Sequence, residues 1–107
     1  MKLPADSHIA SEKLTAYLLV FNEQSDKSKF LAEGGYTLAN WKTLDAYLRT
    51  LLENTAIFQK NDPFGDSFAV SGQLNGGIWV KTIWLREIGQ EVFRFITLIP
   101  QSKHAEQ

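Results

Sequence analysis

The sequence contains no cysteine and only two histidines, and each shortage excludes a class of site. Without cysteine there is no disulfide framework, no thiolate nucleophile and no thiolate-bound zinc. His8 and His104 lie near opposite ends of the chain, so a metal site built on two histidines is not expected. A formal net charge of −1 argues against attraction of the whole molecule to nucleic acid, and leaves a local basic patch as the alternative.

Long hydrophobic runs are also missing. No segment approaches the roughly 20 apolar residues that span a bilayer, and Met1–Asp6 lacks the apolar core of a secretory signal. We therefore expect a soluble cytoplasmic protein that does not bind membranes. The chain has 107 residues and is expected to form one domain over residues 1–107, with an extended lead-in at 1–10 and a flexible tail at 101–107.

The first half of the chain has the apolar spacing of helices. Ser11 is predicted to cap the N-terminus of a helix, with a buried stripe formed by Leu14, Tyr17, Leu18 and Phe21. A second, short helix is predicted over residues 27–33, opened by Ser25 or Asp26. The longest helix is predicted from about residue 39 to 53. Its apolar face consists of Trp41, Leu44, Leu48, Leu51 and Leu52.

After Ala56 the period changes from that of a helix to that of strands, in which alternate residues share a face. Four strands are predicted, over residues 56–60, 67–74, 78–86 and 92–99. Tight turns rich in Gly, Pro, Asn and Asp separate them, and Gly72 indicates a bulge in the second strand. The predicted fold class is α+β, with three N-terminal helices packed on a four-stranded antiparallel meander sheet.

The last two predicted strands form a hairpin whose faces differ in character. If Arg86 opposes Glu91, one face carries Val80, Thr82, Trp84, Phe93, Phe95 and Thr97, and the other carries Lys81, Ile83, Leu85, Val92, Arg94 and Ile96. In one interpretation the aromatic face is core and the charged side chains lie over apolar neighbours. In the other, Lys81, Arg86 and Arg94 form a cationic cluster that holds a phosphate and stabilises charge in phosphoryl transfer.

Two further pairs of residues have both a structural and a functional interpretation. Lys27 and Lys29 begin the second helix, where the helix dipole disfavours cations, so they are either solvated or phosphate ligands. Trp79 and Trp84 point to opposite faces of the hairpin, so one of them should be at least partly exposed. An exposed tryptophan serves either a protein interface or the stacking of a nucleic-acid base.

Six segments, taken in order along nearly the whole chain, resemble the successive motifs of an uncharacterised bacterial family, the domain-of-unknown-function family 6883. The segments are Lys13-Leu14 with Tyr17-Leu18-Leu19, Lys27-Ser28-Lys29-Phe30, Gly35-Tyr36-Thr37, Phe64-Gly65, Val80-Lys81-Thr82-Ile83-Trp84 and Phe93-Arg94-Phe95-Ile96-Thr97. The order of helices and strands in that family is similar to the toxin-type RNases of the barnase, EndoU, colicin and RelE group.

This resemblance implies an RNase fold that cleaves RNA without a metal or a cofactor. The matching positions are Lys27, Lys29, Thr82, Trp84, Arg94 and Thr97. Lys29 and Arg94 would bind phosphate or stabilise charge, and Thr82 and Thr97 would orient the phosphate. Lys27, Lys81, Arg86 and Trp84 would contact the substrate. RelE-like enzymes imply that Lys and Arg can replace the usual histidines.

RNA is the partner that this hypothesis predicts, and His8 would reach a site on the sheet only if the N-terminal segment folds back. The alternative is a catalytically silent module of the same fold that binds a cognate protein through the exposed aromatic side of the hairpin. The positions of the cations separate the two hypotheses. The enzyme is favoured if Lys27 or Lys29 lies within reach of Lys81, Arg86 or Arg94 around a concave surface. The binding module is favoured if these cations are scattered over a convex, solvent-facing surface.

Overall fold

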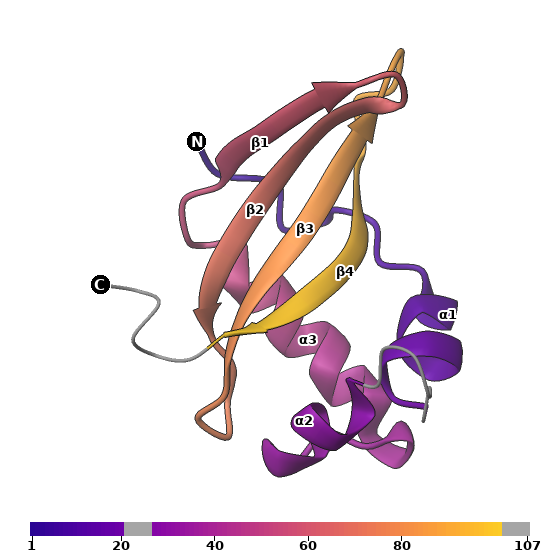
Figure 1. Cartoon of the computed structure of the whole chain (residues 1–107), viewed down its shortest axis with the longest axis vertical. Coiled ribbons are helices and arrows are strands. Elements are labelled where there is room, and N and C mark those ends of the chain that lie inside the picture. The colour runs from indigo at the N-terminus through magenta and orange to yellow at the C-terminus, as the bar shows by residue number, and fades with distance from the viewer. Residues whose placement is uncertain (21–26, 102–107) are drawn as a thin grey trace.

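The computed structural model describes residues 1–20 and 27–101, and its main element is a four-stranded antiparallel sheet (Figure 1). The strands are β1 (Ile57–Asp62), β2 (Gly65–Gln73), β3 (Trp79–Glu87) and β4 (Phe93–Gln101). They are neighbours in chain order, so the predicted α+β class and antiparallel meander are confirmed. The predicted turn at 61–66 is wrong in length, because β1 and β2 both extend into it and leave only Pro63 and Phe64 between them.

The β3–β4 hairpin joins the predicted partners in a different register. Trp84 lies opposite Phe95 rather than Phe93, a shift of two residues that leaves the predicted faces unchanged at this point. Farther along β4, Ile96 is an extra residue between two regular pairs, which is a β-bulge. The bulge turns Thr97 away from the core face, where it was predicted, so that it lies opposite Ile83.

Gly72 does not mark the bulge that was predicted for β2, since it pairs regularly with Val80. The irregularity in this half of the sheet lies in β1, between Phe58 and Lys60. A Cβ at Gly72 would lie 2.6 Å from the Asn54 side chain. The absence of a side chain at Gly72 therefore lets the end of the long helix approach the sheet.

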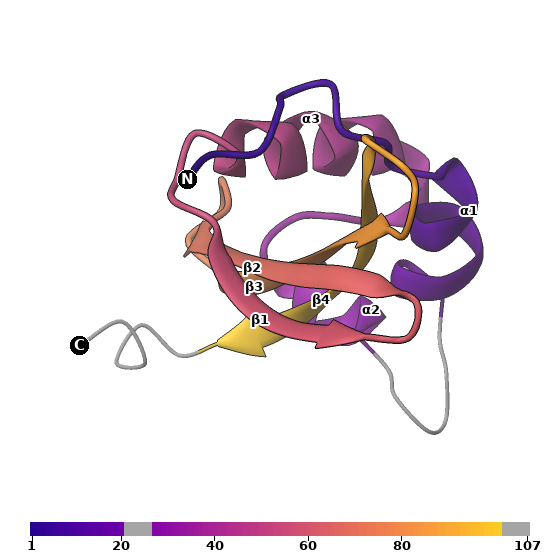
Figure 2. The ribbon, with the colours of Figure 1, turned by 90° about the horizontal axis from the view of Figure 1, so that it is seen from above.

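One face of the sheet is covered by α3 (Trp41–Leu51), which lies behind the strands in Figure 1 and above them in Figure 2. The short 3-10 turn η2 (Leu38–Asn40) precedes it, and the Thr37 N–H donates to Asn40 Oδ1 over 2.8 Å. This helix confirms the longest predicted stripe, with Trp41 half-buried at its start. The fully buried side chains between helix and sheet include Leu44, Leu48, Val70, Val80, Trp84, Phe95 and Leu98.

The first predicted helix is shorter and less regular than its apolar stripe suggested. A single α-turn, α1 (Ser11–Lys13), runs into the π-helical segment η1 (Leu14–Leu18), in which the Leu19 N–H donates to the Leu14 carbonyl over 3.0 Å. Leu14 and Leu18 are fully buried, as predicted. Ala10 rather than Ser11 occupies the capping position, so the predicted cap is wrong.

The second predicted helix is α2 (Ser28–Glu33), which buries Leu31. Phe21 and the predicted caps Ser25 and Asp26 lie outside the described residues. The three predicted helices are therefore one long helix, α3, and two short helical segments. Within residues 1–20 and 27–101, no helix combines the length and the apolar character needed to cross a bilayer.

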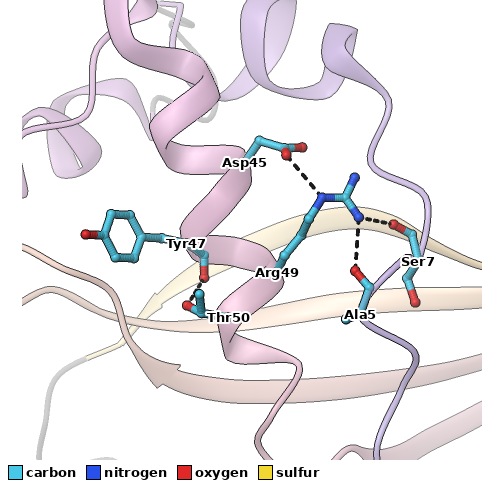
Figure 3. Close-up of polar contacts among 6 residues, drawn as sticks. All are labelled: Ala5, Ser7, Asp45, Tyr47, Arg49 and Thr50. Carbon is cyan, nitrogen blue, oxygen red and sulfur yellow. Dashed lines mark hydrogen bonds and ion pairs between the residues drawn. The ribbon is translucent and has the colours of Figure 1, made fainter.

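The N-terminal residues 1–10 form an arm that is docked on both layers. Figure 3 shows that Arg49 of α3, which is paired with Asp45, points toward this arm. Arg49 Nη1 donates to the carbonyls of Ser7 over 2.7 Å and Ala5 over 3.2 Å. Charged donors make stronger hydrogen bonds than neutral donors, so α3 holds the arm in place.

Directly after Ser7, the arm folds back onto the free edge of β4. The His8 N–H donates to the Phe93 carbonyl and the His8 carbonyl accepts from the Phe95 N–H, each over 2.8 Å. These bonds make a parallel bridge between His8 and Arg94. The condition under which His8 could reach the sheet is therefore met.

Candidate phosphate-binding site

A hollow of about 560 Å³ opens where the first helical segment approaches β4. It is lined by Ala10, Glu12, Lys13, Ala16, Tyr17, Ile96 and Thr97. Lys27 contacts this lining, because its Nζ donates to Thr97 Oγ1 over 2.9 Å and lies 5.6 Å from the centre of the Tyr17 ring. We call the site formed by Lys13, Tyr17, Lys27 and Thr97 the lysine hollow.

Local irregularities of the backbone assemble the lysine hollow. The bulge at Ile96 turns the Thr97 hydroxyl out of the core and onto the edge of the site. Lys13 and Tyr17 are four residues apart across the junction of α1 and η1, a spacing that places both on one side of the helical segment. Lys27 directly precedes α2, and its carbonyl accepts from the Leu31 N–H over 3.0 Å.

The lysine hollow contains two cations without an ion pair among the described residues, and the Glu12 carboxylate also lines it. Within the described part of the chain, no ion pair involves Lys13 or Lys27, whereas Arg49, Arg86 and Arg94 each pair with a carboxylate. Each lysine ammonium has three N–H donors and no acceptor. Two such ammonium groups beside a hydroxyl are an arrangement that binds phosphate oxygens.

The family model for a domain of unknown function, DUF6883, matches residues 2–102. The chain belongs to the DUF6883 family. The resemblance noted from the sequence motifs is therefore confirmed at the level of the family. No curated protein and no solved structure matches the chain. The family description names no activity, so the likeness to toxin-type RNases stays a prediction.

The DUF6883 domain places Arg94 in a second hollow, of about 250 Å³, farther along the same edge of β4. We call it the His8 hollow, and its lining is His8, Glu87, Gln90, Val92 and Arg94. Arg94 Nη2 lies 2.5 Å from Glu87 Oε1, so its charge is neutralised. His8 and Glu87 were not among the predicted site residues. The sequence analysis named His8 only on the condition that the N-terminal segment folds back, and the backbone bridge to β4 meets this condition.

Thr82 and Trp84 were predicted to contact the phosphate and the substrate, and both are fully buried. Thr82 Oγ1 donates to the Val70 carbonyl over 2.7 Å and accepts from Trp84 Nε1 over 2.8 Å. A substrate cannot reach either side chain in this structure, so both have a packing role. This result confirms the interpretation of the aromatic hairpin face as core. Half-buried Trp79 lies on the opposite face, as predicted.

The predicted cationic cluster of Lys81, Arg86 and Arg94 does not form. Arg86 is opposite Asp66 in the β2–β3 ladder and forms an ion pair with it over 3.2 Å. Lys81 lines a separate hollow of about 310 Å³ near the end of α3. Lys29 is exposed on α2 and lines neither the lysine hollow nor the His8 hollow. Of the predicted cations, Lys27 is therefore the one that joins a predicted threonine. Within the described residues, neither Lys27 nor Lys29 lines a hollow with Lys81, Arg86 or Arg94, so the predicted cations do not meet the test that would favour the enzyme. The case for an enzyme rests instead on Lys13 and Lys27.

Two groups with a shifted pKa, Asp66 and Tyr36, line neither the lysine hollow nor the His8 hollow. The Asn61 amide, followed by Arg86, lowers the pKa of the Asp66 carboxyl by stabilising its charged form. Burial, together with the nearby Tyr47, raises the pKa of the Tyr36 phenol, which donates to the Asn75 carbonyl over 2.7 Å. In the described residues no cluster of three or more histidine and carboxylate side chains could hold a metal ion.

Proposed function

We propose that the DUF6883 domain binds single-stranded RNA at the lysine hollow and cleaves it without a metal. The observation that carries the proposal is the 2.9 Å bond between Lys27 Nζ and Thr97 Oγ1. This bond holds the Lys27 ammonium group against Thr97, which lines the hollow. Among the described residues, Lys27 has no carboxylate partner. Lys13 lines the same hollow, so two positive charges face the space that a phosphate would occupy.

The proposed reaction uses the 2′-hydroxyl of the RNA as the nucleophile. The 2′-oxygen forms a bond to the neighbouring phosphorus, and the bond from phosphorus to the 5′-oxygen breaks, which gives a 2′,3′-cyclic phosphate and a free 5′-hydroxyl. The Glu12 carboxylate, which lines the hollow, accepts the 2′-proton, and the Lys13 ammonium donates a proton to the leaving oxygen. Lys27 stabilises the charge that develops on the phosphoryl oxygens.

The test is incubation of bulk RNA with the protein in excess chelator, with Lys27→Met compared with Lys29→Met. Loss of the charge that stabilises the transition state is expected to slow cleavage about 10²- to 10³-fold in Lys27→Met. Lys29→Met removes an equal charge from the same short segment, yet outside the hollow, and should retain the wild-type rate. The products should carry cyclic phosphate ends. Absence of cleavage by the wild type over a wide pH range would reject the proposal.

A protein-binding module is the second candidate, supported by exposed apolar side chains at one end of the sheet. Phe64, Ile88 and Val92 are 74%, 71% and 57% exposed, and the Ile88 N–H donates to the Phe64 carbonyl over 3.2 Å. An apolar patch of this kind is typical of a protein interface. If this function holds, the wild-type protein should keep a defined protein partner after treatment with RNase. The double variant Ile88→Ser, Val92→Ser should lose that partner. Neither protein should cleave RNA.

A further inference from the structure

The His8 hollow lies next to the lysine hollow on the edge of β4. Arg94 and Thr97 are three residues apart on this strand, a distance of at most about 10 Å. The N-terminal arm runs beside β4 in the same direction, with His8 bridged to Arg94 and Ala10 at the lysine hollow. If Lys27 holds a phosphate, the nucleoside attached to that phosphate can therefore reach the His8 hollow.

The polar groups of the His8 hollow offer donors and acceptors side by side. Arg94 and Glu87 are bonded to each other, and their side chains remain 48% and 44% exposed. The guanidinium has five N–H donors, so further donors remain after one is used. The second oxygen of the Glu87 carboxylate is an acceptor, and Val92 and His8 line the hollow beside it and provide surface for the faces of a planar ring.

Guanine is the base whose edges match this set. Its O6 and N7 atoms are two adjacent acceptors, which is the array that an arginine binds with two donors. Its N1–H and N2–H₂ groups, next to O6, are two adjacent donors that suit a carboxylate. Adenine and cytosine present an amino donor where guanine presents O6, and uracil lacks the second donor.

We propose that the His8 hollow binds a guanine base of the RNA, with Arg94 donating to O6 and N7 and Glu87 accepting from N1–H and N2–H₂. This inference deepens the proposed function, because it states which nucleoside lies beside the scissile phosphate. The N-terminal arm then belongs to the binding site, since His8 forms one wall of the hollow. Cleavage is expected beside guanosine.

The first experiment measures binding of the four nucleoside 5′-monophosphates to the full chain by NMR titration, which needs no cleavage. The guanosine nucleotide should bind at least about tenfold more tightly than the other three, within the range of one bidentate contact. Glu87→Gln should abolish this preference. The matched control is Glu91→Gln, a carboxylate in the same turn that does not line the hollow, and it should keep the preference. Equal binding of the four nucleotides, or an unchanged preference in Glu87→Gln, would overturn the proposal.

The second experiment maps the cut sites in an RNA of mixed sequence. Cuts concentrated beside guanosine in the wild type, and spread over all four bases in Glu87→Gln, would support the assignment. Wild-type cleavage without base preference would overturn the guanine site and leave the proposed RNase function intact. Absence of cleavage, together with selective binding of the guanosine nucleotide, would instead reject the RNase function and retain the base-binding site.

Discussion

Two threonines on adjacent strands make similar hydrogen bonds in opposite surroundings. Thr82 Oγ1 on β3 accepts from Trp84 Nε1 over 2.8 Å, and Thr97 Oγ1 on β4 accepts from Lys27 Nζ over 2.9 Å. The first threonine is fully buried, whereas the second lines an open hollow. The same side chain therefore stabilises the core in one place and positions a charge at the surface in the other.

The difference lies in what each hydroxyl leaves accessible. Thr82 uses its donor on the Val70 carbonyl and an acceptor site on Trp84, and both partners are enclosed. The partner of Thr97 is an ammonium group whose remaining N–H donors can point into the hollow. A bond between two buried groups contributes to folding, while the bond to Lys27 holds a half-exposed cation in the position that the proposed binding of phosphate requires.

The largest effect is expected from Trp84→Ala. Trp84 is fully buried and its ring packs edge-on against Phe95, with ring centres 5.3 Å apart. Removing a buried tryptophan typically lowers the free energy of unfolding by about 3–5 kcal/mol. Trp79→Ala, on the half-buried face of the same strand, should lower it by less. Urea denaturation of both variants provides the comparison, and equal losses would contradict the assignment of the two faces.

The direct comparison is Thr82→Val with Thr97→Val, which remove the same hydroxyl. Thr82→Val leaves the Trp84 Nε1–H buried without its acceptor and removes the hydroxyl donor to the Val70 carbonyl, which should lower the free energy of unfolding by about 1–3 kcal/mol. Thr97→Val should change that free energy by less and should instead weaken RNA cleavage, because Lys27 loses its anchor. Denaturation curves and cleavage rates of both variants test the contrast. A greater loss of stability in Thr97→Val would break it.

The sheet was predictable from sequence because its signals are local. Alternation of apolar residues and Gly-rich turns indicate the four strands, and the stripe that ends in Leu51 and Leu52 indicates α3. The same reasoning correctly placed Trp84 in the core face of the hairpin. It could not place Thr97, because a single extra residue at Ile96 reverses every face that follows it.

The candidate site was only partly predictable, because long-range contacts assemble it. The Lys27–Thr97 bond joins residues that are 70 positions apart, and His8 reaches β4 through backbone bonds that no side-chain pattern encodes. The predicted cationic cluster failed for a related reason. Arg86 and Arg94 share a hairpin, but Arg86 forms an ion pair with Asp66 and Arg94 forms one with Glu87.

An intermediate effect is expected from Arg49→Met, which loosens the N-terminal arm. Arg49 is one-third exposed and bonds two carbonyls of the arm, so its loss should lower the free energy of unfolding by about 1–2 kcal/mol. Hydrogen exchange should accelerate at the His8 and Phe95 amides, which form the bridge to β4. Exchange at the Thr82 amide, in the middle of the sheet, should change less. Unaltered exchange at His8 would show that the arm is held without Arg49.

The smallest effect is expected at Asp66, whose carboxylate accepts from Asn61 and pairs with Arg86 on the surface. Because these partners lower the pKa of Asp66 in the folded chain, the carboxylate stabilises the fold at pH values above its unfolded pKa of about 3.9. The contribution is lost as the pH falls through the lower folded pKa. Thermal melting of wild type and Asp66→Asn should therefore differ slightly at pH 7 and converge in strong acid. Glu53→Gln, which removes an exposed carboxylate without an ion pair in the described residues, is the control and should show no such pH-dependent difference. A difference between wild type and Asp66→Asn that grows toward acid pH would mean that the surface pair does not stabilise the folded chain.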